Sequence, residues 1–263
     1  MCAGAVFAAF MVYQRSDYEG IWMQALTVIS FIFVASLSWL VAGTVPSTAA
    51  VPFGQGLFGS SETALKNKKE FGQWADMWRR HTLSKRSHMD ENRQKRNPPE
   101  QPAAVGMVKC VGRMKAYCNQ TAWEKFIQEN QGKPVEELLP LVNDYINRSR
   151  YIVDPVNWGL PDYWATPQEF MLKDGDCEDY AISKYITLKR LDVDVSALRL
   201  VVVQDENLRV AHAVLAAYVG DSIQILDNQV KAVVPHEQIL HYRPVYSVNE
   251  SGWWLHQRKR FGR

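Results

Sequence analysis

The chain of 263 residues contains a cysteine, a histidine and an aspartate whose placement suits nucleophilic catalysis. Cys177 stands in the first turn of a predicted helix, where unpaired backbone N–H groups and the helix dipole favour a thiolate. His212 lies in an apolar, β-branched segment, and Asp227 ends the next such segment. These residues match the roles of nucleophile, base and orienting carboxylate. The sequence thus predicts a Cys177–His212–Asp227 triad.

Hairpin geometry brings the last two of these residues together. If Gly220 and Asp221 form a two-residue loop, His212 lies opposite Gln229 and diagonal to Asp227. Taken singly, a histidine on a strand is more often structural, and a lone cysteine in a helix is usually part of the core. The combination in this order favours the catalytic interpretation.

Four carboxylates surround the predicted nucleophile, and a thiolate would be repelled by each of them. One unscreened carboxylate at about 4 Å opposes a thiolate by about 4 kcal/mol at an effective dielectric constant near 20. A calcium ion would neutralise this charge, because calcium takes several oxygen ligands in a flexible geometry. The alternative is that they are ordinary acids at a helix start, favoured by the dipole. The predicted calcium ligands are Asp174, Asp176, Glu178 and Asp179.

The elements that must position these residues follow from apolar spacing. A helical pattern begins at residue 71, and further helical patterns cover residues 121–130, 135–146 and 176–190. Pro140 is expected to kink or restart the helix at 135–146. Asp174 or Asp176 can cap the last helix. Residues 198–204, 210–219 and 222–228 are rich in β-branched and apolar side chains and predict antiparallel strands. Helices followed by a meander indicate an α+β fold.

Four short motifs carry a resemblance to a known family. Residues 164–170 read WATPQEF, residues 174–182 read DGDCEDYAI, residues 209–215 read RVAHAVL and residues 225–228 read ILDN. Together they resemble the signature of the bacterial transglutaminase-like cysteine proteinases, the LapG-type periplasmic proteases, over roughly residues 71–246. The resemblance implies a papain-like, transglutaminase-type fold with N-terminal helices packed on an antiparallel sheet. It also implies the same triad and calcium dependence through the acidic segment.

The resemblance further implies a substrate and a partner. LapG-type proteases cleave a large surface adhesin near its N-terminus at a di-alanine site, which releases the adhesin and disperses biofilm. An inner-membrane receptor for cyclic di-GMP holds them inactive. Exposed aromatic residues such as Trp158 and Trp164 are candidates for a docking surface, although a tryptophan is more often part of a core.

The N-terminal segment predicts export. Residues 20–61 carry no charged side chain, and residues 21–43 are long enough to cross a membrane. Small residues at 48–50 fit a signal-peptidase site, so cleavage after Ala50 competes with retention as a membrane anchor. The true start is either Met1 or Met23. We expect a periplasmic protein, either released or anchored in the inner membrane.

Composition and cysteine content limit the class of protein and the state of its other cysteines. The chain is 47% hydrophobic and 22% charged with a formal charge of +2, which is typical of a globular protein and gives no support to nucleic-acid binding. Cys110 and Cys118 either form a disulfide or are two free, buried cysteines. The predicted organisation is a leader at 1–50, a linker and basic helical segment at 51–100, a catalytic domain at 101–250 and a basic tail at 251–263.

Two other functions share parts of this pattern. A transglutaminase-like amidase or crosslinking enzyme would use the same triad on a glutamine side chain or on cell-envelope peptides. A non-catalytic periplasmic adaptor would keep the fold as a docking surface. The filled triad positions favour an enzyme over an adaptor. The resemblance favours water as the acceptor of the acyl group, so we expect a cysteine endopeptidase.

Overall fold

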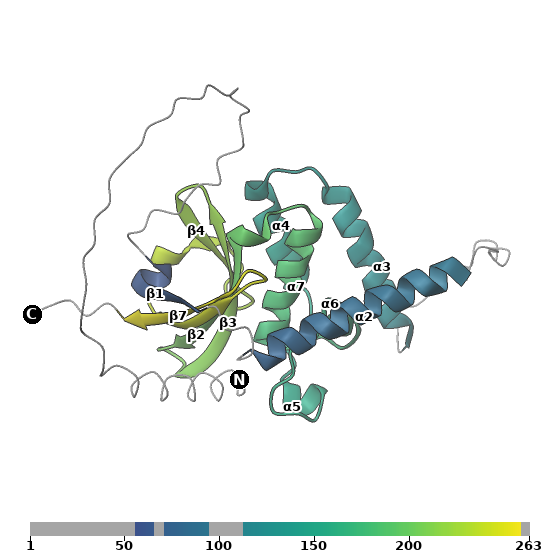
Figure 1. Cartoon of the computed structure of the whole chain (residues 1–263), viewed down its shortest axis with the longest axis horizontal. Coiled ribbons are helices and arrows are strands. Elements are labelled where there is room, and N and C mark those ends of the chain that lie inside the picture. The colour runs from purple at the N-terminus through teal and green to yellow at the C-terminus, as the bar shows by residue number, and fades with distance from the viewer. Residues whose placement is uncertain (1–55, 66–70, 95–112, 259–263) are drawn as a thin grey trace, which may run out of the picture.

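A seven-stranded antiparallel sheet carries a layer of helices on one face (Figure 1). The computed structural model describes residues 56–65, 71–94 and 113–258. Mixed helices and antiparallel strands confirm the predicted α+β class. The strand order is β1-β7-β6-β2-β3-β4-β5. These strands span Ser60–Leu65 (β1), Leu198–Asp205 (β2), Val210–Val219 (β3), Ser222–Leu226 (β4), Val234–Pro235 (β5), Tyr242–Val248 (β6) and Trp253–Arg258 (β7).

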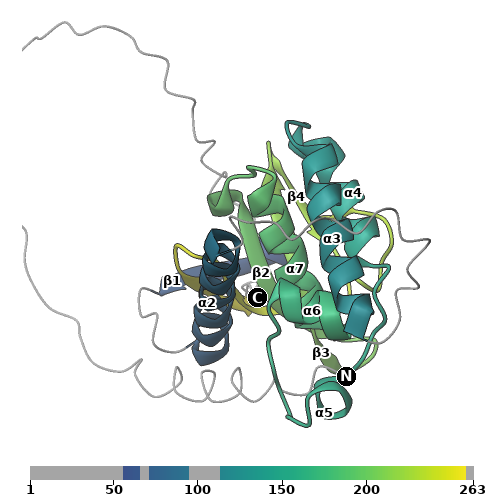
Figure 2. The same ribbon diagram turned by 90° about the vertical axis from the view of Figure 1, so that its right-hand side faces the viewer.

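The helical layer is centred on one buried helix, α7. The helices are α2 (Gly72–Gln94), α3 (Arg113–Asn130), α4 (Val135–Ile146), α5 (Asp154–Asn157), α6 (Pro167–Lys173) and α7 (Cys177–Arg190). Every residue of α7 from Cys177 to Leu188 is buried, because the sheet covers one side of the helix and other helices cover the rest. Figure 2 shows α2 on one side of α7 and α3 and α4 on the other. Cys177 therefore begins the most enclosed helix of the fold.

The hairpin between β3 and β4 has the predicted register. Val219 pairs with Ser222 and Leu215 pairs with Leu226 across a two-residue loop. Gly220 has a φ of 55°, a backbone conformation that glycine adopts without the penalty a side chain would bring. The expected placement of His212 near Asp227 follows from this register.

Pro140 does not restart its helix, which was one of the two outcomes expected from the sequence. α4 runs without a break from Val135 to Ile146 and includes the proline. Pro140 is exposed, whereas Leu138, Leu139 and Val142 are buried. Because the proline lies on the solvent side, water can satisfy the carbonyl that loses its intrahelical donor, and burial of the apolar face keeps the helix continuous.

The sheet uses residues on both sides of the segment predicted as the catalytic domain. Residues 251–263 were predicted to be a basic tail, but residues 253–258 of this segment form strand β7. β1 and α2 lie within 51–100, and β1 pairs with β7. Phe71, just before α2, contacts Trp253 with ring centroids 4.7 Å apart. Aromatic burial thus joins the two flanking segments to the core.

Several expectations concern residues outside the described part. The leader at 1–50 and Cys110 are among them. Within the described residues, no helix is both long and apolar enough to cross a membrane. Trp164 is only 2% exposed and belongs to the core, so the structure removes it from the candidate docking surface, whereas Trp158 is half-buried with Lys173 Nζ 4.0 Å from its ring centroid.

Candidate active site

A tight turn between α6 and α7 places Cys177 at the start of its helix. Asp176 occupies the N-cap position, and its backbone N–H donates a hydrogen bond of 3.3 Å to Oδ2 of Asp179. A Cβ on Gly175 would come within 2.2 Å of that same oxygen, so the turn requires glycine. Asp174 has a φ of 65°, and its carboxylate accepts hydrogen bonds from Arg150 N and Nε. The DGDC motif is thus a local structural unit.

The side chain of Cys177 lies against β3. It is fully buried and packs on Ala213, the residue next to His212. The α7–β3 contact therefore brings the predicted nucleophile to the strand that carries the predicted base. The sulfur is disulfide-bonded in this structure. Nucleophilic attack by Cys177 consequently requires the reduced form.

His212 and Asp227 form a buried hydrogen-bonded pair. His212 Nε2 lies 2.8 Å from Asp227 Oδ1. The same carboxylate accepts from Tyr242 Oη at 2.7 Å and from the backbone N–H of Gln229 at 2.9 Å. Burial alone would raise the pKa of Asp227, but the hydrogen bonds and the attraction of His212 outweigh it and lower the pKa. An ionised Asp227 can hold the imidazole in one orientation.

A second group of buried carboxylates lies beside Cys177. Oxygen atoms of Asp154, Asp176 and Glu178 all lie within 4.8 Å of one another. Oε2 of Glu178 is also 3.2 Å from Sγ of Cys177. Burial, with repulsion from Asp176, raises the pKa of Asp154 to about 7, and burial raises that of Glu178 well above its usual value. Three carboxylates so placed disfavour their own charge and any charge on the sulfur.

The oxygen-only donor set of this cluster fits calcium. Oδ1 of Asp154 and Oδ1 of Asp176 are buried and accept no hydrogen bond from the described residues, so both are available as ligands. Hard cations such as calcium prefer carboxylate oxygens. Asp154, Asp176 and Glu178 would hold the ion, and its charge would offset the repulsion.

The four acids predicted as calcium ligands separate into two groups. Asp176 and Glu178 belong to the cluster. Asp174 instead pairs with Arg150, at 3.0 Å between Oδ2 and Nη2. Asp179 accepts from the backbone N–H of Ala165 at 2.6 Å and from that of Asp176, so its carboxylate holds the turn together.

Sequence reasoning missed Asp154. This residue begins α5 and precedes Pro155, and an acid there is ordinary at a helix start. It lies far from Cys177 in sequence, and only the fold brings it close: Ile152 N donates to Gly175 O at 2.8 Å, and Asp154 N donates to Asp176 Oδ2 at 3.4 Å. These backbone contacts dock the segment before α5 onto the DGDC turn.

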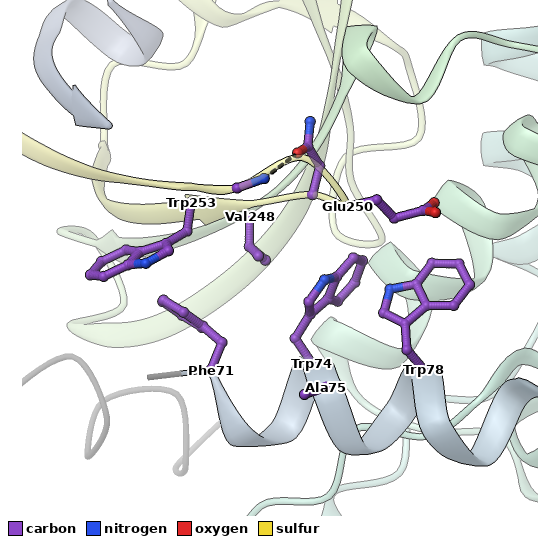
Figure 3. A pocket seen from close by; sticks show the side chains of 9 residues that line it. Phe71, Trp74, Ala75, Trp78, Val248, Glu250 and Trp253 are labelled. Carbon is purple, nitrogen blue, oxygen red and sulfur yellow. Dashed lines mark hydrogen bonds between the residues drawn. The ribbon is translucent and has the colours of Figure 1, made fainter. Parts of the chain in front are cut away.

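An apolar pocket lies elsewhere in the part of the chain that the structure describes. It measures about 300 Å³ and is lined by α2 and the turn between β6 and β7, with Trp74, Trp78 and Trp253 around it (Figure 3). Neither Cys177, His212 nor Asp227 lines this pocket. The site defined by the triad candidates is thus separate from the tryptophan-lined pocket.

Comparison with known proteins agrees with the chemistry of this site. Residues 97–260 match the family of bacterial transglutaminase-like cysteine proteinases. The chain belongs to this family. The match includes the cysteine, histidine and aspartate together with the acidic turn, and it confirms the family resemblance found in the sequence. No curated protein sequence matches the chain.

Solved structures of a family member are similar to this chain. Legionella pneumophila LapG is 36% identical, with a TM-score of 0.50, and the match covers 53% of this chain and 79% of that protein. A calcium-bound form of the same LapG is 35% identical over 54% of this chain and 80% of its own, also with a TM-score of 0.50. An EGTA-treated form matches with 36% identity. The chain is therefore a LapG-like cysteine proteinase, and one of the structures it resembles is calcium-bound.

The position of the acids leads to a prediction about calcium affinity. Asp154→Asn should weaken calcium binding at least tenfold, because it replaces a charged ligand in the cluster with a neutral one. Asp174→Asn is the matched control, since Asp174 faces Arg150, and it should retain wild-type affinity. Calorimetric titration of calcium into EGTA-treated, dialysed protein measures both. Loss of affinity in Asp174→Asn with retention in Asp154→Asn would contradict the assignment.

Proposed function

We propose that this protein is a calcium-dependent cysteine endopeptidase in which Cys177 is the nucleophile, His212 the base and Asp227 the orienting residue. The observation that carries the proposal is the buried His212–Asp227 hydrogen bond on the strand against which Cys177 packs. Family membership supports a cysteine protease, and the packing of Cys177 on the strand that carries His212 is the contact that supports these three residues.

The residues suit an acyl-transfer reaction. With Cys177 reduced, Nδ1 of His212 would accept the thiol proton, and the sulfur would attack the peptide carbonyl carbon. Collapse of the tetrahedral intermediate would break the C–N bond, with the imidazolium returning its proton to the leaving amine. A water molecule, deprotonated by His212, would then hydrolyse the thioester and regenerate the thiol. Asp227 would stabilise the imidazolium throughout.

The proposed role of calcium is to offset the negative charge of the carboxylates beside Cys177. Asp154, Asp176 and Glu178 would hold the ion, which would supply positive charge close to the sulfur. With the carboxylates neutralised in this way, the N-terminus of α7 and His212 can stabilise the thiolate. The calcium-bound LapG supports a calcium requirement.

The proposed substrate and partner rest on the resemblance to LapG-type proteases. We propose that the protein cleaves a large surface adhesin near its N-terminus, at a di-alanine site, and so releases it from the cell and promotes biofilm dispersal. An inner-membrane receptor for cyclic di-GMP would hold the enzyme inactive. The proposed location is the periplasm, reached through the uncharged N-terminal segment, with inner-membrane anchoring if that segment is kept.

The triad is tested by cleavage of an adhesin fragment under reducing conditions. Cys177→Ala should abolish cleavage, and His212→Ala and Asp227→Ala should each lower kcat about 10²-fold or more. Each histidine or aspartate change should add nothing to Cys177→Ala, since the residues act as a unit. Asp221→Ala, in the exposed hairpin turn, is the matched control and should keep wild-type activity.

N-terminal sequencing of the products locates the cleaved bond. Cleavage retained in Cys177→Ala would overturn the nucleophile assignment. Release of ammonia or formation of crosslinked products without chain cleavage would identify the protein as an amidase or crosslinking enzyme instead. An absence of both reactions together with a Cys177 inert to iodoacetamide would indicate a non-catalytic adaptor.

Export is tested with a reporter that is active only outside the cytoplasm. A fusion of residues 1–60 to this reporter should give signal, because the uncharged segment is long enough to enter the export pathway. Fractionation then separates the two forms: a soluble product beginning near Val51 indicates cleavage, and a full-length membrane product indicates an anchor. Activity of a cytoplasmic reporter alone would refute export.

A further inference from the structure

One lysine is buried in the core behind the candidate site. Lys184 lies in the middle of α7 and is 1% exposed. Its Nζ lies 5.9 Å from the ring centroid of Tyr180, and it forms no ion pair or hydrogen bond with the described residues. Burial of an ammonium group without a direct partner disfavours its charged form. The surroundings of Lys184 must therefore offset part of this cost.

The packing of α7 places Lys184 beside the end of α4. Lys184 follows Cys177 by seven residues and Tyr180 by four, so it lies on the same side of α7 as both. On that side Cys177 packs on β3, and Tyr180 Oη donates to Ser149 O at 2.6 Å, just after α4. α4 and α7 also pack on each other (Figure 2). Lys184 thus lies in the buried wedge between α4, α7 and β3.

Asn147 joins this wedge to the candidate site. It is the C-cap residue of α4, and its Nδ2 donates to Asp227 O at 2.8 Å. Its Oδ1 is buried and accepts no hydrogen bond from the described residues. This oxygen is therefore available to an ammonium group or to a water molecule bound by one.

Asp227 is the opposite charge that acts on Lys184. Burial lowers the pKa of Lys184 to about 7, and the attraction of Asp227 opposes this effect. The two side chains form no ion pair, so the attraction acts through space or through a bridging water. Because an attraction between two charges favours both, the ammonium group also favours the ionised form of Asp227.

Other titratable groups near Lys184 are exposed or have partners of their own. α7 itself carries Glu178 and Asp179 in its first turn and Lys189 and Arg190 in its last. The elements packed against α7 add Glu136, Glu137, Asp144 and Tyr145 on α4, Glu169 and Lys173 on α6, Arg199 and Asp205 on β2, and His212 and Tyr218 on β3.

We propose that Lys184 is a positioning residue whose buried ammonium group is the counter-charge that keeps the Asp227 carboxylate ionised beside His212. The proposal rests on the role given above to Asp227. Two of the donors to this carboxylate, Tyr242 Oη and the backbone N–H of Gln229, are neutral. While the imidazole of His212 is also neutral, Asp227 is a buried anion, and Lys184 supplies the positive charge that offsets it.

Lysine ¹³Cε NMR measures this coupling directly. The signal of Lys184, identified by its loss in Lys184→Met, follows the charge of the ammonium group as the pH changes. Asp227→Asn should lower the midpoint of the Lys184 titration by about half a pH unit or more, the size expected for unit charges about 10 Å apart in partly screened surroundings. Lys189 is the internal control, because it lies on the same helix and pairs with Glu250. Its signal should be the same in both proteins.

The pH profile of cleavage tests the consequence for the site. Lys184→Met keeps a side chain of similar length without the charge. It should move the acid limb of the kcat–pH profile to higher pH by about half a unit with KM unchanged, because Asp227 loses its counter-charge. A merely structural role would lower kcat equally at every pH. Lys189→Met is the matched control and should keep the wild-type profile.

The outcomes separate this proposal from the function on which it rests. An unchanged Lys184 midpoint in Asp227→Asn, or an unshifted acid limb in Lys184→Met, would overturn the counter-charge. Absence of cleavage by the wild-type protein would count against the proposed function, and the NMR comparison would still show whether the two charges are coupled. Circular dichroism identifies a variant that fails to fold. If Lys184→Met does so, the comparison with Asp227→Asn decides, since that variant keeps Lys184 in place.

Discussion

The structure depends on how negative charge is balanced beside one buried sulfur. Glu178 contacts Cys177 Sγ, and Asp154 and Asp176 complete a group of carboxylates within 4.8 Å. At an effective dielectric constant near 20, a single carboxylate about 4 Å away opposes a thiolate by about 4 kcal/mol. The helix dipole contributes up to about 2 kcal/mol in the opposite direction, which does not compensate for even one charge. A cation bound by these carboxylates would offset the repulsion.

The α6–α7 turn couples this charge to the rest of the site. Gly175 lets the turn approach Asp179, and the Asp179 carboxylate fixes the turn to Ala165. α7 packs its buried face on β3. The acidic cluster at the start of α7 therefore lies beside the strand that carries His212. Asp179, whose carboxylate binds backbone N–H groups, thus lies within a few residues of Asp176 and Glu178, the acids proposed to bind calcium. This arrangement explains why a short motif carries both structural and functional constraints.

Much of this arrangement was predictable from local pattern, and the remainder depends on contacts distant in sequence. The α7 start, the strands around His212 and the Gly220–Asp221 turn follow from periodicity and turn chemistry. β6 was missed because Pro244 and a bulge opposite Val202 and Val203 obscure its alternation. Asp154 was missed because only tertiary packing brings it to Asp176. The separate roles of Asp174 and Asp179 likewise required their partners, Arg150 and Ala165.

The central claim is that calcium in the acidic cluster permits ionisation of Cys177. The most direct test is an ultraviolet titration of the reduced thiolate in saturating calcium and in EGTA, with Cys177→Ser as the blank. The account predicts that calcium lowers the midpoint of the Cys177 titration by at least about one pH unit, because it offsets a repulsion whose unscreened size is about three units. Identical titration curves with and without calcium, in protein shown to bind the ion, would contradict it.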